Sequence, residues 1–236
     1  MQKEWKADVT PVTETDFLIN KMLIEAVNST FPSHGILAEE ESDMKAGAEY
    51  VWVCDPVDGT MPFSHGVPIC AFSLALVKDG ESILGVVYDP FSDRLFSAVK
   101  NQGAMLNGNS ISVSKIDTFK GALGDFEGGS SAHYDLFPMV RHLGMNEMTK
   151  LMKLSSFIYP SVLVAAGEFA FTLFPSKSTH DAAAVKIIVE EAGGKVTDIF
   201  GNEQRYDEPI NGLIASNGIL HDRLVELAKK FVEVRG

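Results

Sequence analysis

Two aspartates, Asp55 and Asp58, stand three residues apart after an apolar, β-rich run that begins at Tyr50. Pro56 fixes φ and lacks a donor, so we expect it to end the strand, and Gly59 lets the backbone bend sharply. The two carboxylates would then converge, and converging carboxylates repel each other unless a cation lies between them. Oxygen ligands of this kind suit Mg²⁺. We therefore predict a divalent-metal site where this strand ends.

The alternative interpretation is an ordinary turn, because Asp-Pro pairs followed by glycine occur in many loops. Two further acidic groups stand at the ends of predicted elements, Glu39 with Glu40 after one strand and Asp181 at the start of a helix. Alone, the glutamates would suggest a solvated loop and Asp181 a partner of the helix dipole. Together with Asp55 and Asp58 they favour a pocket of carboxylates for two or three divalent cations.

The composition is that of an ordinary globular protein, with 45% hydrophobic and 22% charged residues in a chain of 236. A net charge of -12 disfavours binding to nucleic acid, so a protein of this charge that handles phosphate esters needs local cations. Cys54 and Cys70 lie in apolar runs and predict buried free thiols in a reducing compartment. We see neither a signal segment nor an apolar run of spanning length, so we expect a soluble, cytoplasmic protein without membrane contact.

These groups depend on strands and helices that position them. Strand-like runs between residues 69 and 113, separated by turn signals, predict an antiparallel meander. Strands mixed with helices throughout predict a layered α/β or α+β sandwich. A boundary near 119–129 would divide the chain into a metal- and phosphate-binding part, 1–120, and a part that completes the site, 121–236, within one compact unit. The predicted helices span residues 13–30, 133–143, 156–166, 179–191 and 219–234.

The six residues from Asp55 to Thr60 resemble the D-P-I/V-D-G-T signature of the inositol monophosphatase family, the Mg²⁺-dependent, often lithium-sensitive phosphatases of small molecules. Further segments resemble other motifs of that family in the same order along the chain. The resemblance implies a layered αβαβα sandwich of the sugar-phosphatase type. The further matching segments are residues 6–16, 31–34 with 39–40, 85–90, 103–108, 180–184 and 191–194.

Carried over to the matching positions, the resemblance implies two main metal sites. Glu39, Asp55 and the carbonyl of Val57 would hold the first Mg²⁺. Asp55, Asp58 and Asp181 would hold the second, and a third, weaker ion would lie near Glu39. Li⁺ is then expected to inhibit.

The resemblance also implies groups that act on the substrate. Asp16 and Thr60 would form a hydrogen-bonded pair that orients and deprotonates the attacking water, with Glu39 among the catalytic groups. The N–H groups of Gly59 and Thr60 would hold the phosphate, as helix N-termini do. We expect Asp58 to contact the substrate as well.

Departures from the family's pattern bear on the substrate. Phe174 stands where the family has a glutamate that contacts inositol, which argues against myo-inositol phosphate as the preferred substrate. Lys177 is our candidate for a substrate-binding cation, although a solvated surface lysine is an equal alternative. His180 replaces a tryptophan, and we expect it to pack like an aromatic rather than to titrate near neutral pH. Pro62 replaces an asparagine. The chain also begins almost at the first motif, which leaves open whether it forms a homodimer.

The sequence therefore predicts a Mg²⁺-dependent phosphatase that hydrolyses a small phosphomonoester with a metal-activated water. The candidate substrates are a sugar phosphate, histidinol phosphate and a nucleotide 3′-phosphate. The alternative is a non-catalytic binding or regulatory protein on a degenerate phosphatase scaffold, which Pro62 and His180 motivate. A third hypothesis, metal bound for stability alone, is disfavoured because Asp16 and Thr60 stand at their matching positions.

Overall fold

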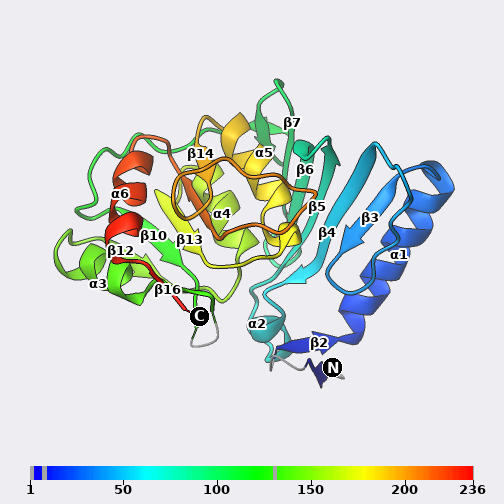
Figure 1. Cartoon of the computed structure of the whole chain (residues 1–236), viewed down its shortest axis with the longest axis horizontal. Coiled ribbons are helices and arrows are strands. Elements are labelled where there is room, and N and C mark those ends of the chain that lie inside the picture. Colours follow the sequence, from blue (N-terminus) through cyan, green and yellow to red (C-terminus); the bar gives the residue numbers. More distant parts are fainter. Residues whose placement is uncertain (1–2, 7–9, 130–131, 236) are drawn as a thin grey trace.

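Two β-sheets with a pair of helices between them form the frame of the chain (Figure 1). This computed structural model describes residues 3–6, 10–129 and 132–235. One helix covers the outer face of the first sheet, and two cover the outer face of the second. The predicted αβαβα sandwich is confirmed. From one outer layer to the other the helices are α1 (Glu14–Thr30), α4 (Ile158–Ala165) with α5 (Ala183–Glu191), and α3 (Phe137–Met145) with α6 (His221–Phe231).

The first sheet has seven strands in the order β3-β4-β5-β6-β7-β8-β9. β3 is parallel to β4, and each later neighbour is antiparallel to the one before it, as the predicted meander requires. Its strands are β3 (Gly35–Ala38), β4 (Tyr50–Asp58), β5 (Ala71–Lys78), β6 (Glu81–Asp89), β7 (Arg94–Val99), β8 (Ala104–Leu106) and β9 (Asn109–Ser110).

The second sheet has five strands in the order β12-β10-β13-β15-β14, parallel across the first three and antiparallel beyond them. Its strands are β12 (Lys150–Met152), β10 (Leu123–Phe126), β13 (Phe171–Phe174), β15 (Leu213–Ser216) and β14 (Lys195–Thr197). Two small strand pairs and two short helices complete the fold: β1 (Lys3–Trp5) with β2 (Pro11–Thr13), β11 (Tyr134–Asp135) with β16 (Glu233–Val234), α2 (Thr60–Ser64) and the 3₁₀ helix η1 (Thr179–Asp181).

Successive side chains of a strand point to opposite faces of its sheet, so the apolar side chains of one strand pack into two separate cores. In β4, Val53 faces the central layer, while Cys54 faces α1. In β13, Leu173 packs toward α3 and α6, whereas Phe174 packs toward the central layer. The central core therefore draws on both sheets. The first sheet ends before residue 120 and the second begins after it, but the division into 1–120 and 121–236 stays a prediction.

Local signals account for the start of α1. The Thr13 side chain accepts from the Asp16 amide and the Asp16 carboxylate accepts from the Thr13 amide, which together form a capping box, and the Thr15 amide also donates to Thr13. The prediction that Pro56 ends its strand is wrong. β4 continues to Asp58, and its pairing with β5 shifts register between Asp55 and Asp58, so the proline sits in an irregular part of the strand.

Other predicted boundaries also shift. The helix predicted over 179–191 is two elements, because the chain leaves the helical conformation at Ala182 between η1 and α5. Both cysteines are buried and free, as predicted. Among the described residues, no helix is long and apolar enough to cross a membrane.

Gly85 sets the distance between β6 and α5. A Cβ there would lie 2.5 Å from Ile187 Cγ2 and 3.0 Å from the Ala184 carbonyl oxygen. Gly85→Ala should push α5 away from the first sheet and lower the free energy of unfolding by roughly 1–3 kcal/mol in urea titrations. Gly128→Ala is the matched control, since a Cβ at Gly128 meets nothing within 4 Å. Equal stability losses in the two variants would contradict the packing argument.

His221 makes stability depend on pH. Its ring is fully buried and lies 3.0 Å from Thr197 Oγ1 and 2.9 Å from Ser216 Oγ. Burial, helped by the nearby charge of Lys195, lowers the His221 pKa from 6.5 to about 4. Because the folded pKa lies below the unfolded one, the stabilisation is complete above pH 6.5 and is lost as the pH falls toward 4.

The measurement compares urea unfolding of the native chain with that of His221→Gln from pH 7.5 to pH 4. The native chain should lose stability relative to the variant as the pH falls, because glutamine does not titrate. A stability difference that stays constant over this range would show that His221 does not carry the effect.

Candidate active site

A cavity of about 750 Å³ lies where the end of β4 faces loops from the second half of the chain. Lys6 from the N-terminal segment and Thr60 at the start of α2 also line it. Residues 7–9 of the first predicted motif lie outside the described residues. The structure thus brings every predicted metal ligand to one cavity: Glu39, Asp55, Val57, Asp58 and Asp181.

Three aspartates of this cavity are almost completely buried. Asp55 is 2%, Asp58 4% and Asp181 6% exposed. Burial, together with the charges of Glu39, Asp58 and Asp181, raises the pKa of Asp55 well above its usual range. Burial likewise raises the pKa values of Asp58 and Asp181 to about 7. Their charged forms are therefore destabilised within the chain, and a divalent cation would reverse this.

Asp58 is held by the N-terminus of α4. Its carboxylate accepts hydrogen bonds from the amides of Phe157 at 2.8 Å, Ile158 at 3.1 Å and Tyr159 at 3.2 Å, and from the hydroxyl of Ser156. These amides have no acceptor within their own helix, and the helix dipole favours a negative charge at this end. Asp58 therefore caps a helix that lies about a hundred residues further along the chain.

The other carboxylates have partners too. Asp181 accepts a hydrogen bond from the Ser176 hydroxyl. Glu39 and Glu40 both accept from the Lys6 ammonium, at 2.8 and 2.7 Å. Burial alone would lower the Lys6 pKa, but the hydrogen bonds and charges of the two glutamates outweigh it and raise that pKa.

The donor set fits Mg²⁺ in chemical type, because it consists of buried carboxylates and one backbone carbonyl. In the side-chain orientations that the structure describes, no three Asp, Glu, His or Cys residues form a group that could hold a metal ion. Glu39 accepts a hydrogen bond from Lys6, and Asp181 accepts one from Ser176, in these orientations. Lys6 supplies the positive charge nearest to Glu39 in this arrangement.

Asp16 and Thr60 lie together, as the sequence predicts. Thr60 Oγ1 lies 3.4 Å from Asp16 Oδ1 and 2.8 Å from the Val57 carbonyl oxygen, so its single proton is placed better for Val57. Asp16 is fully buried, and its other oxygen accepts from the Thr13 amide at 2.9 Å. Burial raises the Asp16 pKa, while the bonds from Thr13 oppose the shift.

Gly59 has the left-handed conformation, with φ of 82°, and directly precedes α2. A Cβ at this position would lie 3.3 Å from the Ile69 carbonyl oxygen, which is a tight contact. The first amides of α2, beginning with Thr60, have no acceptor within the helix and stand at its positive end. This is the arrangement that holds anions such as phosphate in many proteins.

The described lysines that line the cavity are Lys6 and Lys153, not Lys177, which we predicted to bind substrate. Lys177 is exposed and is not among the described residues that line the cavity. Lys153 does line it, with its ammonium 3.1 Å from Glu127 Oε2 and 2.6 Å from the Gly128 carbonyl oxygen. Lys153 and Glu127 therefore form a charged pair at the cavity in addition to the pairing of Lys6 with Glu39 and Glu40.

Aromatic side chains form another part of the cavity's surroundings. Phe174 is fully buried, and Phe157 stacks on it with ring centroids 5.0 Å apart. Phe157 in turn lines the cavity. The His180 side chain is 18% exposed, and burial lowers its pKa, so the ring is neutral near pH 7, as expected for a packed ring.

Reasoning from sequence missed Lys153, Ser156, Phe157 and Ser176. A signal existed for Ser156, because serine before an apolar run is typical of a helix start. No local pattern reveals that Asp58, 98 positions earlier, is its partner.

Comparison with known proteins identifies the family of the chain. The profile of the inositol monophosphatase family matches residues 1–233. A fructose-1,6-bisphosphatase/inositol-1-monophosphatase of Thermotoga maritima is 34% identical over 226 residues, which cover 95% of this chain and 85% of the relative. A histidinol-phosphatase of Chlorobaculum parvum is 32% identical over 223 residues, 93% of this chain and 84% of the relative.

The fold agrees as well. The solved structure of an IMPase from Thermotoga maritima superposes with a TM-score of 0.87 at 32% identity, covering 98% of this chain and 88% of that one. The chain therefore belongs to the inositol monophosphatase family and is an enzyme of the phosphoric monoester hydrolase class.

Proposed function

We propose that this enzyme hydrolyses a small phosphomonoester with the help of two or three Mg²⁺ ions held in the carboxylate cavity. The observation that carries the proposal is the burial of Asp55, Asp58 and Asp181 on one cavity, with the pKa of each raised. When bound, Mg²⁺ would lower the pKa of a water molecule and neutralise charge on the phosphoryl group.

The proposed ligand roles are those that the resemblance to the family implies. Asp55 would serve both ion positions. Glu39 and the Val57 carbonyl would complete the first position, and Asp58 and Asp181 the second. A third ion would be held near Glu39. Each of these groups lines the cavity.

The remaining groups of the chain would orient the reactants. Thr60 would accept a hydrogen bond from the attacking water after its own hydroxyl proton turns from the Val57 carbonyl to Asp16 Oδ1, 3.4 Å away. Thr60 would then pass its proton to Asp16 as it takes up the proton of the water. The amides of Gly59 and Thr60 would bind the phosphoryl oxygens. In-line placement of water and phosphorus supplies much of the acceleration in such reactions.

For the substrate we propose an ester with a planar or apolar group beside the phosphate, rather than myo-inositol phosphate. The ring of Phe157 lines the cavity, and Phe174 packs behind it where the family's pattern has a carboxylate. Histidinol phosphate and a nucleotide 3′-phosphate have such planar groups, whereas a simple sugar phosphate does not. Lys153 and Glu127 would meet the polar groups of the leaving alcohol.

The predicted homodimer and cytoplasmic location remain proposals. Exposed apolar side chains on α1 support an interface: Phe17, Leu18 and Met22 are 50%, 59% and 60% exposed. The non-catalytic binding protein stays the alternative, and the experiments below distinguish it from the enzyme.

Asp55→Asn should separate charge repulsion from catalysis. Without metal the variant should have a higher thermal midpoint than the native chain, because one buried charge is removed. Added Mg²⁺ should stabilise the native chain and not the variant. Phosphate release should fall at least about 100-fold in the variant and on addition of EDTA to the native chain. Turnover that persists in EDTA would contradict the proposal.

Asp58→Asn is the matched variant with the opposite expected effect on the metal-free protein. It weakens the cap of α4, so the thermal midpoint should fall, corresponding to about 1–2 kcal/mol of unfolding free energy. Differential scanning fluorimetry in EDTA compares the two variants directly. If both shift in the same direction, the assigned roles of Asp55 and Asp58 are wrong.

Phe157→Ala tests the substrate proposal. For histidinol phosphate and adenosine 3′,5′-bisphosphate, kcat/KM should fall about tenfold, because the planar group loses its apolar contact. For β-glycerophosphate, the change should stay below about threefold. Phe91→Ala is the control, because it removes an aromatic ring that is exposed on the surface. A native enzyme that prefers myo-inositol 1-phosphate over the planar esters would refute the proposal.

A further inference from the structure

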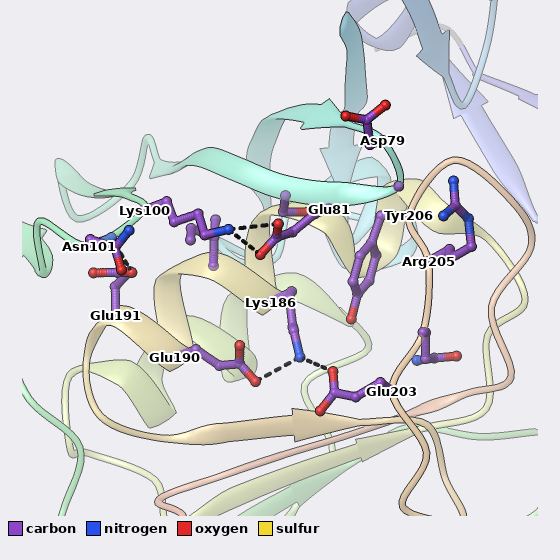
Figure 2. Close-up of a pocket in the computed structure, with 14 residues that line it drawn as sticks. Asp79, Glu81, Lys100, Asn101, Lys186, Glu190, Glu191, Glu203, Arg205 and Tyr206 are labelled. Atoms are coloured by element: carbon purple, nitrogen blue, oxygen red, sulfur yellow. Dashed lines mark hydrogen bonds and ion pairs between the residues drawn. The ribbon is translucent and has the colours of Figure 1, made fainter. Parts of the chain in front are cut away.

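A second cavity, of about 430 Å³, lies at the other end of α5 (Figure 2). None of the described residues that line it also lines the carboxylate cavity. Four segments form its walls: the β5–β6 turn at 79–82, residues 100–101 after β7, the second half of α5, and the loop at 203–206. This volume is within the range of small-molecule sites.

Two hydroxyl groups of this cavity have no hydrogen-bond partner among the described residues. Tyr206 is 1% and Ser82 3% exposed, and neither Tyr206 Oη nor Ser82 Oγ bonds to the chain. Figure 2 shows the Tyr206 side chain directed into the cavity, with its hydroxyl toward Lys186 and Glu203. Buried hydroxyls are normally paired, because an unpaired one destabilises the fold. Both hydroxyls therefore have unused hydrogen-bonding capacity, and because they are almost inaccessible to water, a ligand would reach them through a small movement of the side chains that line the cavity.

The charges around the cavity favour a cation. Its cationic residues are already paired, since Lys186 lies 2.7 Å from Glu190 and 2.6 Å from Glu203, and Lys100 lies 2.6 Å from Glu81. Arg205 is paired with a carboxylate just outside the cavity. An anion would have to displace these carboxylates, whereas an ammonium group would add to them. The acidic residues of the lining outnumber the basic ones: Asp79, Glu81, Glu190, Glu191 and Glu203 against Lys100, Lys186 and Arg205.

The direction of α5 favours a cation as well. The helix ends at Glu191, so its negative end is at this cavity, and its last turn contains no basic residue. A positive charge near a helix C-terminus is stabilised by the helix dipole. One type of ligand, a cation that also forms hydrogen bonds, is therefore favoured by the unpaired hydroxyls, by the excess of carboxylates and by the helix C-terminus.

We propose that this cavity binds a small organic cation that carries at least one ammonium group and one hydroxyl group. The ammonium would lie beside Glu190 and Glu203, which now share the single charge of Lys186. The ligand's hydroxyl would exchange hydrogen bonds with Tyr206 and Ser82. The site is separate from the proposed catalytic cavity and does not depend on the proposed reaction.

Three probes of similar size test the proposal by isothermal titration calorimetry on the full chain at low salt. They are 1,3-diamino-2-propanol, which has both groups, 1,3-diaminopropane, which lacks the hydroxyl, and glycerol, which lacks the amines. The diamino alcohol should bind most tightly and glycerol least. Tyr206→Phe should lower the affinity for the diamino alcohol about tenfold, which is the effect of losing one hydrogen bond. It should leave the affinity for diaminopropane unchanged.

Controls separate this site from other acidic surfaces. Tyr88→Phe removes a hydroxyl that bonds to Asp93 in the β6–β7 region, and it should bind the probes as the native chain does. Asp55→Asn should also bind them normally, so a loss there would place the probes in the catalytic cavity and overturn the proposal. Glu203→Gln should lower the affinity for both diamines, because it removes one of the carboxylates proposed to lie beside the ammonium.

Tyr206→Phe should fold, because it removes only a hydroxyl without a partner, and its thermal midpoint without probe should equal or exceed that of the native chain. Ser82→Ala is the second variant if the first fails to fold. The proposal is overturned if the diamino alcohol does not bind, or if the folded variants bind it as tightly as the native chain does.

Discussion

Buried negative charge at the junction of the two sheets is the constraint on which the structure depends. Asp55 and Asp58 come from β4, and Asp181 comes from η1 before α5, yet all three lie on one cavity and are nearly inaccessible to water. The amides of α4 donate hydrogen bonds that stabilise the buried charge of Asp58, and the Ser176 hydroxyl does the same for Asp181. Among the described residues, Asp55 accepts a hydrogen bond from the Val57 amide, at 3.0 Å, and the charges of Glu39, Asp58 and Asp181 add to the effect of burial in raising its pKa. Asp55 is therefore the carboxylate for which the proposed cation would matter most.

The same constraint shows why the central helices lie where they do. α4 directs its N-terminus at Asp58, and α5 begins immediately after Asp181, so both helices of the middle layer start beside the carboxylates. Gly85 allows α5 to approach the first sheet closely enough to keep Asp181 near β4. Packing in the central core and electrostatics at the cavity therefore support a single arrangement of the two sheets.

Much of the site could be predicted because its signals are local. The acidic motif at the end of β4 depends on residues within a few positions of one another, and the layered fold follows from the pattern of strands and helices. The strand end at Pro56 was predicted wrongly, because pairing with β5 continues across an irregular register. Lys153 and Phe157 were missed because their relation to the cavity depends on contacts between distant segments, and Lys177 shows that nearness in sequence to Asp181 does not place a side chain in the cavity.

The cap that Asp58 provides to α4 also affects how the chain is made. Its donors and acceptor are 98 to 101 positions apart. At typical rates of synthesis, roughly 5 to 20 s separate the translation of Asp58 from that of its partners. Until those partners are made, Asp58 lacks the amides that cap it, and the face of the first sheet that packs against α4 and α5 lacks both helices. The order of the chain therefore places every strand of the first sheet before the groups that offset its acidic end.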